Sequence, residues 1–368
     1  MRDAPIVPPP IAMLAELTHR CPLSCPYCSN PVELIARQRE LDTATWIDVF
    51  RQAAEMGVLQ VHISGGEPAS RRDLVELVKG ARNAGLYVNL ITSGVGLTDA
   101  RLVELDAAGV DHIQLSLQGI TATSADWIGN YRGAFKRKMA VADKIAEIGF
   151  PLTLNAVMHR HNLDDLPEMI DMAKRLGARR IEVACVQFQG WALKNRAMLQ
   201  PTREQVDTAK QVVARARKEN RGTLVFDFVP PDYYADYPKA CMGGWGSTGL
   251  NITPDGRVLP CHAAETIPSL TFQSVADASL KDIWYHGAAF AAYRGTDWMP
   301  GLCKSCDRRD IDFGGCRCQA MAVTGDAAAA DPVCRKSPHR HLVDATLATE
   351  VQPIGDASFQ YRTFQDHS

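Results

Sequence analysis

The chain has 368 residues, of which 46% are hydrophobic and 22% are charged, and its formal net charge is −2. This length allows two domains with a large core, and the near-zero charge excludes the strongly basic balance of a protein that binds nucleic acid through its phosphates. No apolar run approaches the ~18 residues of a membrane span, and the first ten residues lack the apolar segment of a signal peptide, so we expect a cytoplasmic protein with no membrane partner.

Residues 1–10 are proline-rich, and we expect a mobile N-terminal arm. From residue 11 to about 228, strand-like apolar runs alternate with amphipathic helical segments. The predicted strands are 11–17, 58–64, 87–92, 112–117, 152–157 and 181–186. The predicted helices between them are 43–56, 72–84, 99–108, 134–148 and 163–176, and a later one spans 201–220. This alternation indicates a parallel sheet with right-handed crossovers, although the spacing fits a partial barrel and an open doubly wound sheet equally.

Three cysteines follow the first predicted strand at a C-x3-C-x2-C spacing: Cys21, Cys25 and Cys28. Three thiolates fit a cubane iron–sulfur cluster with one iron lacking a protein ligand, because full ligation takes four. An open metal position is where chemistry takes place. The alternative is a zinc knuckle or a disulfide, but zinc usually needs four ligands, and no further Cys or His follows before His62.

Other polar residues lie at predicted strand ends, where parallel barrels gather their chemistry. After the second strand come Gly65, Gly66, Glu67 and Pro68, followed on later strands by Ser116 and Asn155. Two glycines permit close approach to a ligand, and Glu67 offers a negative partner for an ammonium. The alternatives are a tight turn and helix caps.

The remaining cysteines and histidines have simpler interpretations. Cys185 lies in an apolar strand, so we expect a buried thiol. His159, His161, His339 and His341 occur as His-Arg-His pairs, for which we expect exposed basic loops.

A second domain is predicted at 229–340, after the break at Pro230-Pro231, with a C-terminal tail at 341–368. A turn at residues 253–257 predicts a hairpin between two short strands. Seven of the eleven cysteines lie between 241 and 334, and in a reducing compartment such cysteines are metal ligands rather than disulfides. They could hold one cluster with three spare thiols, two clusters with one other ligand, or two zinc ions with His262 as the eighth ligand.

The first loop, with Tyr27 completing a C-x3-C-x-aromatic-C pattern, resembles the radical S-adenosylmethionine (SAM) family. The resemblance implies a partial (β/α)6 TIM-like barrel and a [4Fe-4S] cluster whose free iron chelates SAM. It implies that Gly65, Gly66, Glu67 and Pro68 bind the SAM amino group and that Ser116 and Asn155 contact its ribose and carboxylate. Gln118 stands where many members carry Asp.

The second cysteine region resembles the SPASM extension of the same family, with Cys241-x14-Gly256-x4-Cys261 as its first half. This implies two auxiliary clusters, a [4Fe-4S] and either a [4Fe-4S] or a [2Fe-2S]. The first would be held by Cys241, Cys261, Cys316 and Cys318. The second would be held by Cys303, Cys306, Asp312 and Cys334, with Asp310 as the alternative carboxylate.

Residues 14–31, 61–68 and 115–119 closely resemble the members of this family that crosslink a precursor peptide in pyrroloquinoline quinone (PQQ) biosynthesis. This implies a carbon–carbon bond between a Glu γ-carbon and a Tyr ring of the peptide PqqA, with the peptide chaperone PqqD and a reductant such as flavodoxin as partners. One alternative is another SPASM enzyme, either thioether-forming or sulfatase-maturing. An alternative of another class is a non-catalytic iron–sulfur electron carrier or a zinc-stabilised scaffold.

Overall fold

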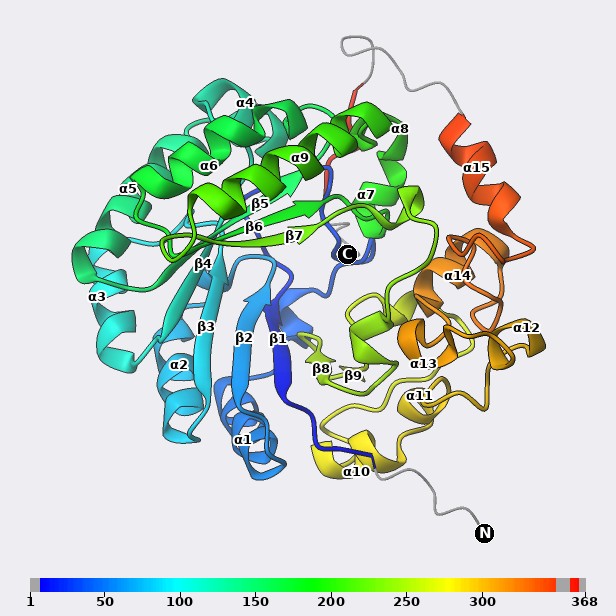
Figure 1. The fold of residues 1–368 in the computed structure, drawn as a ribbon. Coiled ribbons are helices and arrows are strands. Elements are labelled where there is room, and N and C mark those ends of the chain that lie inside the picture. The colour runs from blue at the N-terminus through cyan, green and yellow to red at the C-terminus, as the bar shows by residue number, and fades with distance from the viewer. Residues whose placement is uncertain (1–6, 349–357, 364–368) are drawn as a thin grey trace.

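The structure, a computed structural model, describes residues 7–348 and 358–363 (Figure 1). Its centre is a nine-stranded sheet in the order β7-β6-β5-β4-β3-β2-β1-β8-β9. The first seven strands pair in chain order, and every one of these pairs is parallel. The sheet order has no reversal of the kind that defines a doubly wound fold, so the predicted partial (β/α)6 barrel is confirmed.

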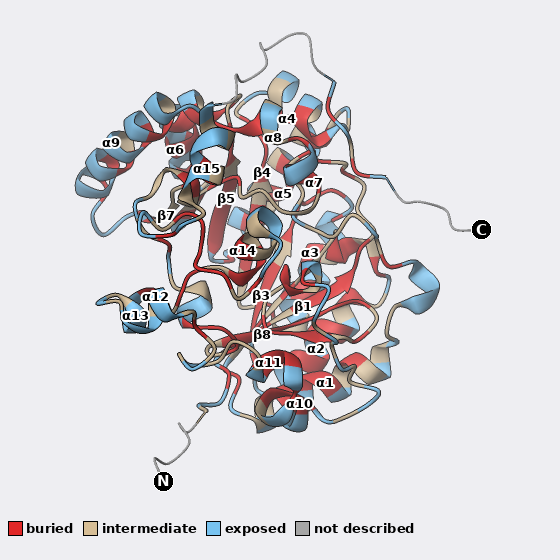
Figure 2. Ribbon diagram, turned by 90° about the vertical axis from the view of Figure 1, so that its right-hand side faces the viewer, coloured by how far each residue is buried: buried red, intermediate tan, exposed pale blue. Residues whose placement is uncertain are grey.

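The predicted strands match the observed ones closely, and a seventh parallel strand follows them at Val225–Val229. The seven parallel strands are β1 (Ala12–Thr18), β2 (Gln60–Gly65), β3 (Tyr87–Thr92), β4 (His112–Leu117), β5 (Leu152–Met158), β6 (Arg180–Cys185) and β7 (Val225–Val229). In β4 and β6, buried residues alternate with more exposed ones, so one face of the sheet is more deeply covered than the other. Figure 2 shows the buried residues concentrated in the strands and on the helix faces that turn towards them.

Helices cover the outer face of the seven parallel strands (Figure 1). They are α1 (Thr43–Glu55), α2 (Leu74–Asn83), α3 (Asp99–Ala108), α4 (Ala122–Gly129), α5 (Ala134–Ile148), α6 (Leu166–Arg175) and α9 (Arg203–Glu219), with the short α7 (Gly190–Lys194) and α8 (Arg196–Leu199) after β6. The sequence pattern did not predict α4, whose start is fixed by a reciprocal cap between Thr121 and Ser124. The predicted helix at 163–176 begins later, because a 3-10 turn at Leu163–Asp165 precedes it.

The cysteine-rich region adds two strands to the same sheet. They are β8 (Gly249–Ile252), which pairs in parallel with β1, and β9 (Val258–Leu259), which pairs antiparallel with β8. The rest of the region is short helices and loops: α10 (Leu280–His286), α11 (Ala288–Ala291), α12 (Gly301–Lys304), α13 (Arg309–Asp312), α14 (Arg317–Thr324) and α15 (Arg340–Ala348). The predicted hairpin is confirmed, but its first strand also extends the barrel sheet, which the local pattern did not predict.

The described parts of both termini lie against the body. Trp284 Nε1 in α10 donates a hydrogen bond to the carbonyl oxygen of Pro8 at 3.0 Å, within the segment predicted to be a mobile arm. The predicted tail begins inside α15, and its residues 358–363 pack near the carboxyl end of β1, as described below. Residues 1–6, 349–357 and 364–368 lie outside the described residues. None of the helices in the described ranges has the length and apolar character that a bilayer span requires.

Candidate active site

The three cysteines of the first motif lie in the loop that leaves the carboxyl end of β1. Cys25 is buried, and Cys21 and Cys28 are partly buried. The loop folds back on itself, because the amide of Cys28 donates to the carbonyl oxygen of Cys25 at 3.1 Å. It is also tied to α4 through the amide of Ser24, which donates to the carbonyl oxygen of Gly129 at 3.0 Å. The loop therefore presents all three thiols at the end of one strand.

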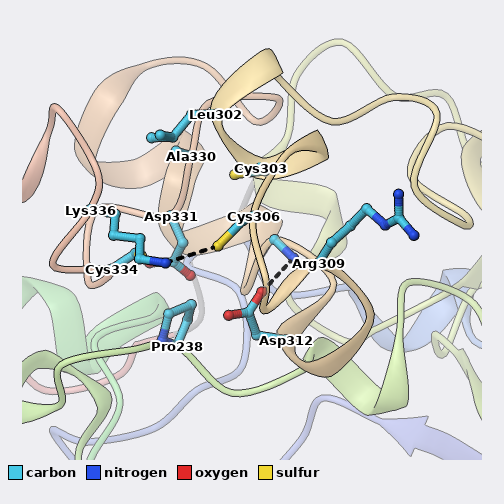
Figure 3. A pocket seen from close by; sticks show the side chains of 11 residues that line it. Pro238, Leu302, Cys303, Cys306, Arg309, Asp312, Ala330, Asp331, Cys334 and Lys336 are labelled. Atoms are coloured by element: carbon cyan, nitrogen blue, oxygen red, sulfur yellow. Dashed lines mark hydrogen bonds between the residues drawn. The ribbon is translucent and has the colours of Figure 1, made fainter.

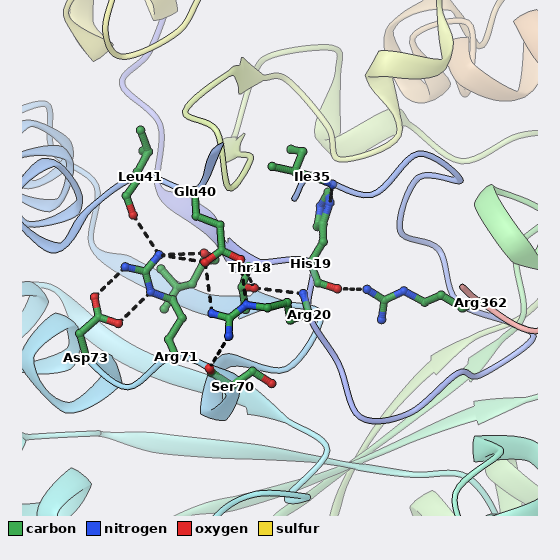
Figure 4. A network of polar contacts seen from close by, with 11 residues as sticks. Thr18, His19, Arg20, Ile35, Glu40, Leu41, Ser70, Arg71, Asp73 and Arg362 are labelled. Carbon is green, nitrogen blue, oxygen red and sulfur yellow. Dashed lines mark hydrogen bonds and ion pairs between the residues drawn. The ribbon is translucent and has the colours of Figure 1, made fainter. Parts of the chain in front are cut away.

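A buried network of charged side chains fixes the start of this loop (Figure 4). Arg71 is 6% exposed, donates to the carbonyl oxygen of Leu17 at 3.1 Å, and pairs with Asp73 at 2.6 Å. Arg20 donates to both carboxylate oxygens of Glu40, each at 3.2 Å. Buried charges are tolerated only when they are paired and hydrogen-bonded. The network therefore holds the last residues of β1 in one conformation.

The two glycines of the second motif are required by a close approach of backbone to backbone. A Cβ on Gly66 would lie 2.4 Å from the carbonyl oxygen of Arg20, and one on Gly65, whose φ is +120°, would lie 2.3 Å from that of Thr18. The sequence prediction attributed these glycines to a ligand. In the structure they bring the end of β2 against the cysteine loop.

Glu67 is fully buried, and both of its carboxylate oxygens accept hydrogen bonds. Thr92 Oγ1 and the amide of Ala69 donate to Oε1 at 2.7 and 3.0 Å. The amide and the hydroxyl of Ser93 both donate to Oε2. Because four donors already use the acceptor sites of this carboxylate, Glu67 joins the ends of β2 and β3, and its predicted contact with a SAM amino group stays a prediction.

The later strands place Ser116 and Asn155 as register partners on β4 and β5. Asn155 Nδ2 donates to Glu182 at 3.3 Å. The sequence prediction missed Lys138, a residue of α5 that is 1% exposed and donates to the carbonyl oxygen of Ser116 at 2.9 Å. Burial lowers the pKa of Lys138 to about 8, although nearby Cys25 acts to raise it. A buried ammonium at this strand end could hold the carboxylate of a bound cofactor.

The expectation of an exposed loop is wrong for His159, which is 1% exposed. Its ring lies 5.7 Å from that of Tyr27 in the cysteine loop. Burial lowers the pKa of His159 to about 3, and its Nδ1 accepts from the amide of His161 at 3.2 Å, so the imidazole is neutral. The hydrophobic pattern of the sequence did not indicate that His159 is buried. β5 continues to Met158, so the histidine follows the strand directly and is directed inward. Cys185, by contrast, is buried as predicted.

The thiols of the first loop suit an iron cluster. Burial raises the pKa of Cys21 to about 12 and that of Cys25 to about 11, and it also raises the pKa of Cys28. Such thiols become thiolates when a metal compensates their charge, since a coordinating thiol is deprotonated outright. Three of them in one loop match a cluster that keeps one iron open.

Four cysteines of the second region converge although they come from three separate segments. Cys318 belongs to the buried cluster that includes Trp245 and Leu259, and Cys241, Cys261 and Cys316 pack against the same cluster. This set is the one predicted for the first auxiliary cluster. The chain brings it together without any long helix or strand, so the ligands and their neighbours define the local structure.

Two buried charged side chains, which bond to the backbone, position this second set. Arg317 is 1% exposed and donates to the carbonyl oxygens of Ala327 and Ala329, both at 2.8 Å. Asp331 is also 1% exposed and accepts from the amide of Cys316 at 2.7 Å. The sequence did not predict that these two residues are buried, because a charged residue between cysteines is typical of a solvent-exposed loop.

The ligands predicted for the second auxiliary cluster line one cavity (Figure 3), namely Cys303, Cys306, Asp312 and Cys334. Asp312 is 7% exposed and accepts from Arg308 Nε at 3.1 Å. Lys336 Nζ lies 3.4 Å from the sulfur of Cys306. Asp310 instead forms an exposed pair with Arg309 at 2.8 Å, so Asp312 is the carboxylate that faces the three thiols.

No three His, Cys, Asp or Glu side chains of the described residues surround one point as the ligands of a single ion would. A cluster makes a different demand, because each of its cysteines binds a separate iron. The three cysteine sets described above are therefore assessed as cluster ligands.

Two open cavities lie between the barrel and the cysteine-rich region. One, of about 760 Å³, is lined by residues 29 and 31–35 after Cys28, by α7 and by His262. The other, of about 620 Å³, lies between α7 and α8 on one side and α14 and α15 on the other. Gln189, Gly190, Leu193 and Thr266 line both cavities. Together they form one recess, and each volume lies in the range of ~300–1,000 Å³ typical of ligand sites.

Comparison with known proteins identifies the family. Residues 15–173 match the radical SAM superfamily, and residues 241–307 match the SPASM iron–sulfur cluster-binding domain. The chain is 67% identical to the PqqA peptide cyclase of Ruegeria pomeroyi over 97% of this chain and 95% of that protein. It is 64% identical to the PqqA peptide cyclase of Rhizobium meliloti over 97% of this chain and 94% of that protein. The chain belongs to the PqqA peptide cyclase family.

Solved structures support the fold of this PqqA peptide cyclase family member. Streptococcus suis SuiB bound to S-adenosylmethionine superposes with a TM-score of 0.74 at 21% identity, covering 89% of this chain and 77% of SuiB. Native anSMEcpe with bound AdoMet and the Kp18Cys peptide gives a TM-score of 0.66 at 14% identity, covering 92% of this chain and 98% of that one. At these identities the likeness shows a shared architecture.

As a radical SAM enzyme of the PqqA peptide cyclase family, the protein uses a [4Fe-4S] cluster, SAM and auxiliary iron–sulfur clusters, and it acts on a peptide. The sequence located the cysteines and the strand ends. It did not identify the buried cations beside them, Lys138 and Arg317, because single charged residues in helices give no signal of burial.

Proposed function

We propose that this enzyme joins the γ-carbon of a Glu to the ring of a Tyr within the peptide PqqA, the first step of PQQ biosynthesis. The observation that carries the proposal is the near full-length identity of 67% to a PqqA peptide cyclase. The three-cysteine loop at the end of β1 supports it, because it can provide the radical chemistry that an unactivated C–H bond requires.

Cys21, Cys25 and Cys28 hold the cluster with the open iron in this proposal. SAM bound there supplies a 5′-deoxyadenosyl radical on one-electron reduction. The chain's own part is to hold and orient SAM and to keep water out. We assign its amino group to Gly65, Gly66, Glu67 and Pro68, through backbone carbonyl oxygens of this segment because the Glu67 carboxylate already accepts four hydrogen bonds. We assign its ribose and carboxylate to Ser116 and Asn155. Lys138 is added as a partner for the carboxylate, since its buried ammonium donates only to a backbone carbonyl among the hydrogen bonds described.

The peptide binds in the recess between the barrel and the cysteine-rich region. Its two cavities meet at Gln189, Gly190 and Leu193, directly after the strand end of β6. The first cavity begins one residue after Cys28, so a peptide lying there has its side chains near the cluster loop. In forming the crosslink, the Glu γ-carbon gives up one hydrogen atom to the 5′-deoxyadenosyl radical, and the Tyr ring gives up one proton and one electron. The auxiliary clusters would accept that electron.

The ligand sets of those auxiliary clusters are part of the proposal. Cys241, Cys261, Cys316 and Cys318 hold the first, and Cys303, Cys306, Asp312 and Cys334 hold the second. Residues 11–228 then form the radical SAM domain and residues 229–340 the auxiliary-cluster domain, with β8 as the strand that joins the second to the sheet of the first. PqqD as the carrier of the peptide, a reductant such as flavodoxin, and a cytoplasmic location complete the proposed setting.

Anaerobic turnover with PqqA, SAM and a reductant tests this function, with the peptide mass as the readout. We expect the peptide to become two hydrogens lighter. The matched controls are C25A, which removes a proposed cluster ligand, and C185A, which removes a buried thiol of β6. Only C25A should abolish the mass change. SAM cleavage with an unchanged PqqA mass would reject the proposed substrate and favour another SPASM reaction.

A further inference from the structure

The C-terminal segment 358–363 lies against the three-cysteine loop. The side-chain amide of Asn195, which is 3% exposed, makes the connection. Its Nδ2 donates to the carbonyl oxygen of Gln360 at 2.8 Å, and its Oδ1 accepts from the amide of Gln360 at 2.8 Å. The same Nδ2 donates to the carbonyl oxygen of Pro26 at 3.0 Å. The segment is therefore tied to the loop between Cys25 and Cys28.

Aromatic packing holds the segment in place beside this amide. Phe359 is 7% exposed, and its ring lies 5.0 Å from that of Trp127 in α4 and 5.8 Å from that of His161 after β5. Aromatic pairs at such separations are stabilising. The segment is thus fixed to two elements of the barrel and to the cysteine loop.

Arg362 projects from this segment towards the other end of the loop. It is 6% exposed, and its Nη2 donates to the carbonyl oxygen of His19, two residues before Cys21 (Figure 4). Its guanidinium therefore lies at the start of the three-cysteine loop, while Asn195 ties the same segment to the middle of that loop.

A guanidinium keeps its charge in every protein environment. A cluster bound by three thiolates carries negative charge, and reduction of the cluster adds one more negative charge. The net charge around an iron–sulfur cluster is one of the factors that set its reduction potential. A fixed cation beside the loop therefore favours the reduced state.

We propose that Arg362, carried by the C-terminal segment 358–363, is a positioning residue that stabilises the reduced form of the cluster at Cys21, Cys25 and Cys28. This inference rests on the proposed function, in which those cysteines hold the cluster. It assigns a role in the active site to a stretch near the end of the chain, more than three hundred residues from the loop it supports.

The experiment is a redox titration of the purified holoenzyme, followed by electron paramagnetic resonance with and without SAM. Only a cluster with an open iron changes its signal when SAM binds, so the SAM-sensitive part of the signal reports the cluster of the first loop. The variants are R362Q, which removes the charge, and R362K, which keeps a charge but loses the planar fork. R215Q, on the exposed face of α9, is the control for the same change in net charge.

We expect R362Q to shift the midpoint potential of the SAM-sensitive signal to more negative values, and R362K to restore most of the shift, while R215Q matches the wild type. A midpoint unchanged in R362Q would overturn the inference. So would loss of the cluster in both R362Q and R362K, or tighter SAM binding in R362Q at an unchanged midpoint, which would mean that Arg362 occupies space needed by SAM. A wild-type protein without any SAM-sensitive signal would instead overturn the proposed function.

Discussion

The two cysteine-rich regions of the molecule are built in opposite ways. Cys21, Cys25 and Cys28 lie on one short loop at the end of a parallel strand, and buried ion pairs in the barrel hold the start of that loop. The cysteines between 241 and 334 come from separate segments with few regular elements around them. The first site is thus formed on one strand end of the sheet, whereas the sites of the second region join residues from several short elements.

The two kinds of cluster site have different structural requirements. An open iron must bind and orient a cofactor, which requires ligands on rigid elements. Clusters that only accept or pass electrons need complete ligation and a suitable environment. The contrast leads to predictions about activity, metal dependence and stability.

The largest expected effect separates the two regions by activity. Replacing Cys25 by Ala should abolish SAM cleavage and remove about four iron atoms per chain, the content of one cubane. Replacing Cys303 by Ala should leave SAM cleavage intact but stop peptide crosslinking. Assays of 5′-deoxyadenosine and of the peptide mass check both. Equal loss of SAM cleavage in the two variants would show that the regions do not act separately.

Removal of the metal should affect the regions unequally. A metal site without a preformed scaffold couples binding to folding, so chelation of iron should speed amide hydrogen exchange in residues 301–334, which lie beyond the strands and helices that pack on the barrel core. Exchange in β2–β5 should stay slow, because those strands are buried by apolar packing. Hydrogen exchange read by mass spectrometry measures both. Uniform acceleration along the chain would contradict the independence of the barrel.

The buried ion pairs of the barrel make a testable contribution to stability. Replacing Arg71 by Ala removes the cation that Asp73 and Glu40 share. Because Asp73 is partly exposed and keeps its bond from Thr43, the free energy of unfolding should fall by no more than about 3 kcal/mol, the lower end for a buried pair. Urea unfolding of the metal-free protein, followed by circular dichroism, measures the change. The control is R51A, which removes surface ion pairs of α1 and should have a much smaller effect.

A smaller expected effect is the pH dependence of stability that the buried imidazole of His159 causes. Burial lowers the pKa of His159 to about 3, whereas an unfolded His titrates near 6.5. Between these two pKa values His159 is protonated in the unfolded chain but neutral in the folded protein. The free energy of unfolding should therefore fall as the pH falls from about 6.5 towards 3. Urea unfolding at several pH values should show a flatter dependence in H159Q. The exposed His286 at the end of α10 provides the control, and H286Q should keep the wild-type slope.

The sequence predicted the barrel well because each of its elements has a local signature. The strands at 87–92 and 112–117 are apolar runs bounded by helical periodicity, and the structure has them at the same residues. The pairing of β8 with β1 is a contact between distant segments, which no local pattern contains. The same holds for Arg362, whose burial depends on where the end of the chain packs, and for His159, which differs from an exposed histidine only in its surroundings.

The cysteine sets were predictable for another reason. Spacing indicates which thiols share a loop, and resemblance to a family indicates which loops share a cluster. Asp312 and Asp310 could be separated only by the structure, in which Asp312 faces the three thiols and Asp310 faces Arg309.

The most direct measurement follows a single hydrogen. PqqA carrying deuterium at the γ-carbons of its Glu residues would be incubated anaerobically with the holoenzyme, SAM and a reductant. We expect deuterium in the 5′-deoxyadenosine that forms, together with a crosslinked peptide that has lost that deuterium and one hydrogen. Unlabelled 5′-deoxyadenosine beside a fully labelled, unmodified peptide would contradict the proposed reaction at the three-cysteine loop.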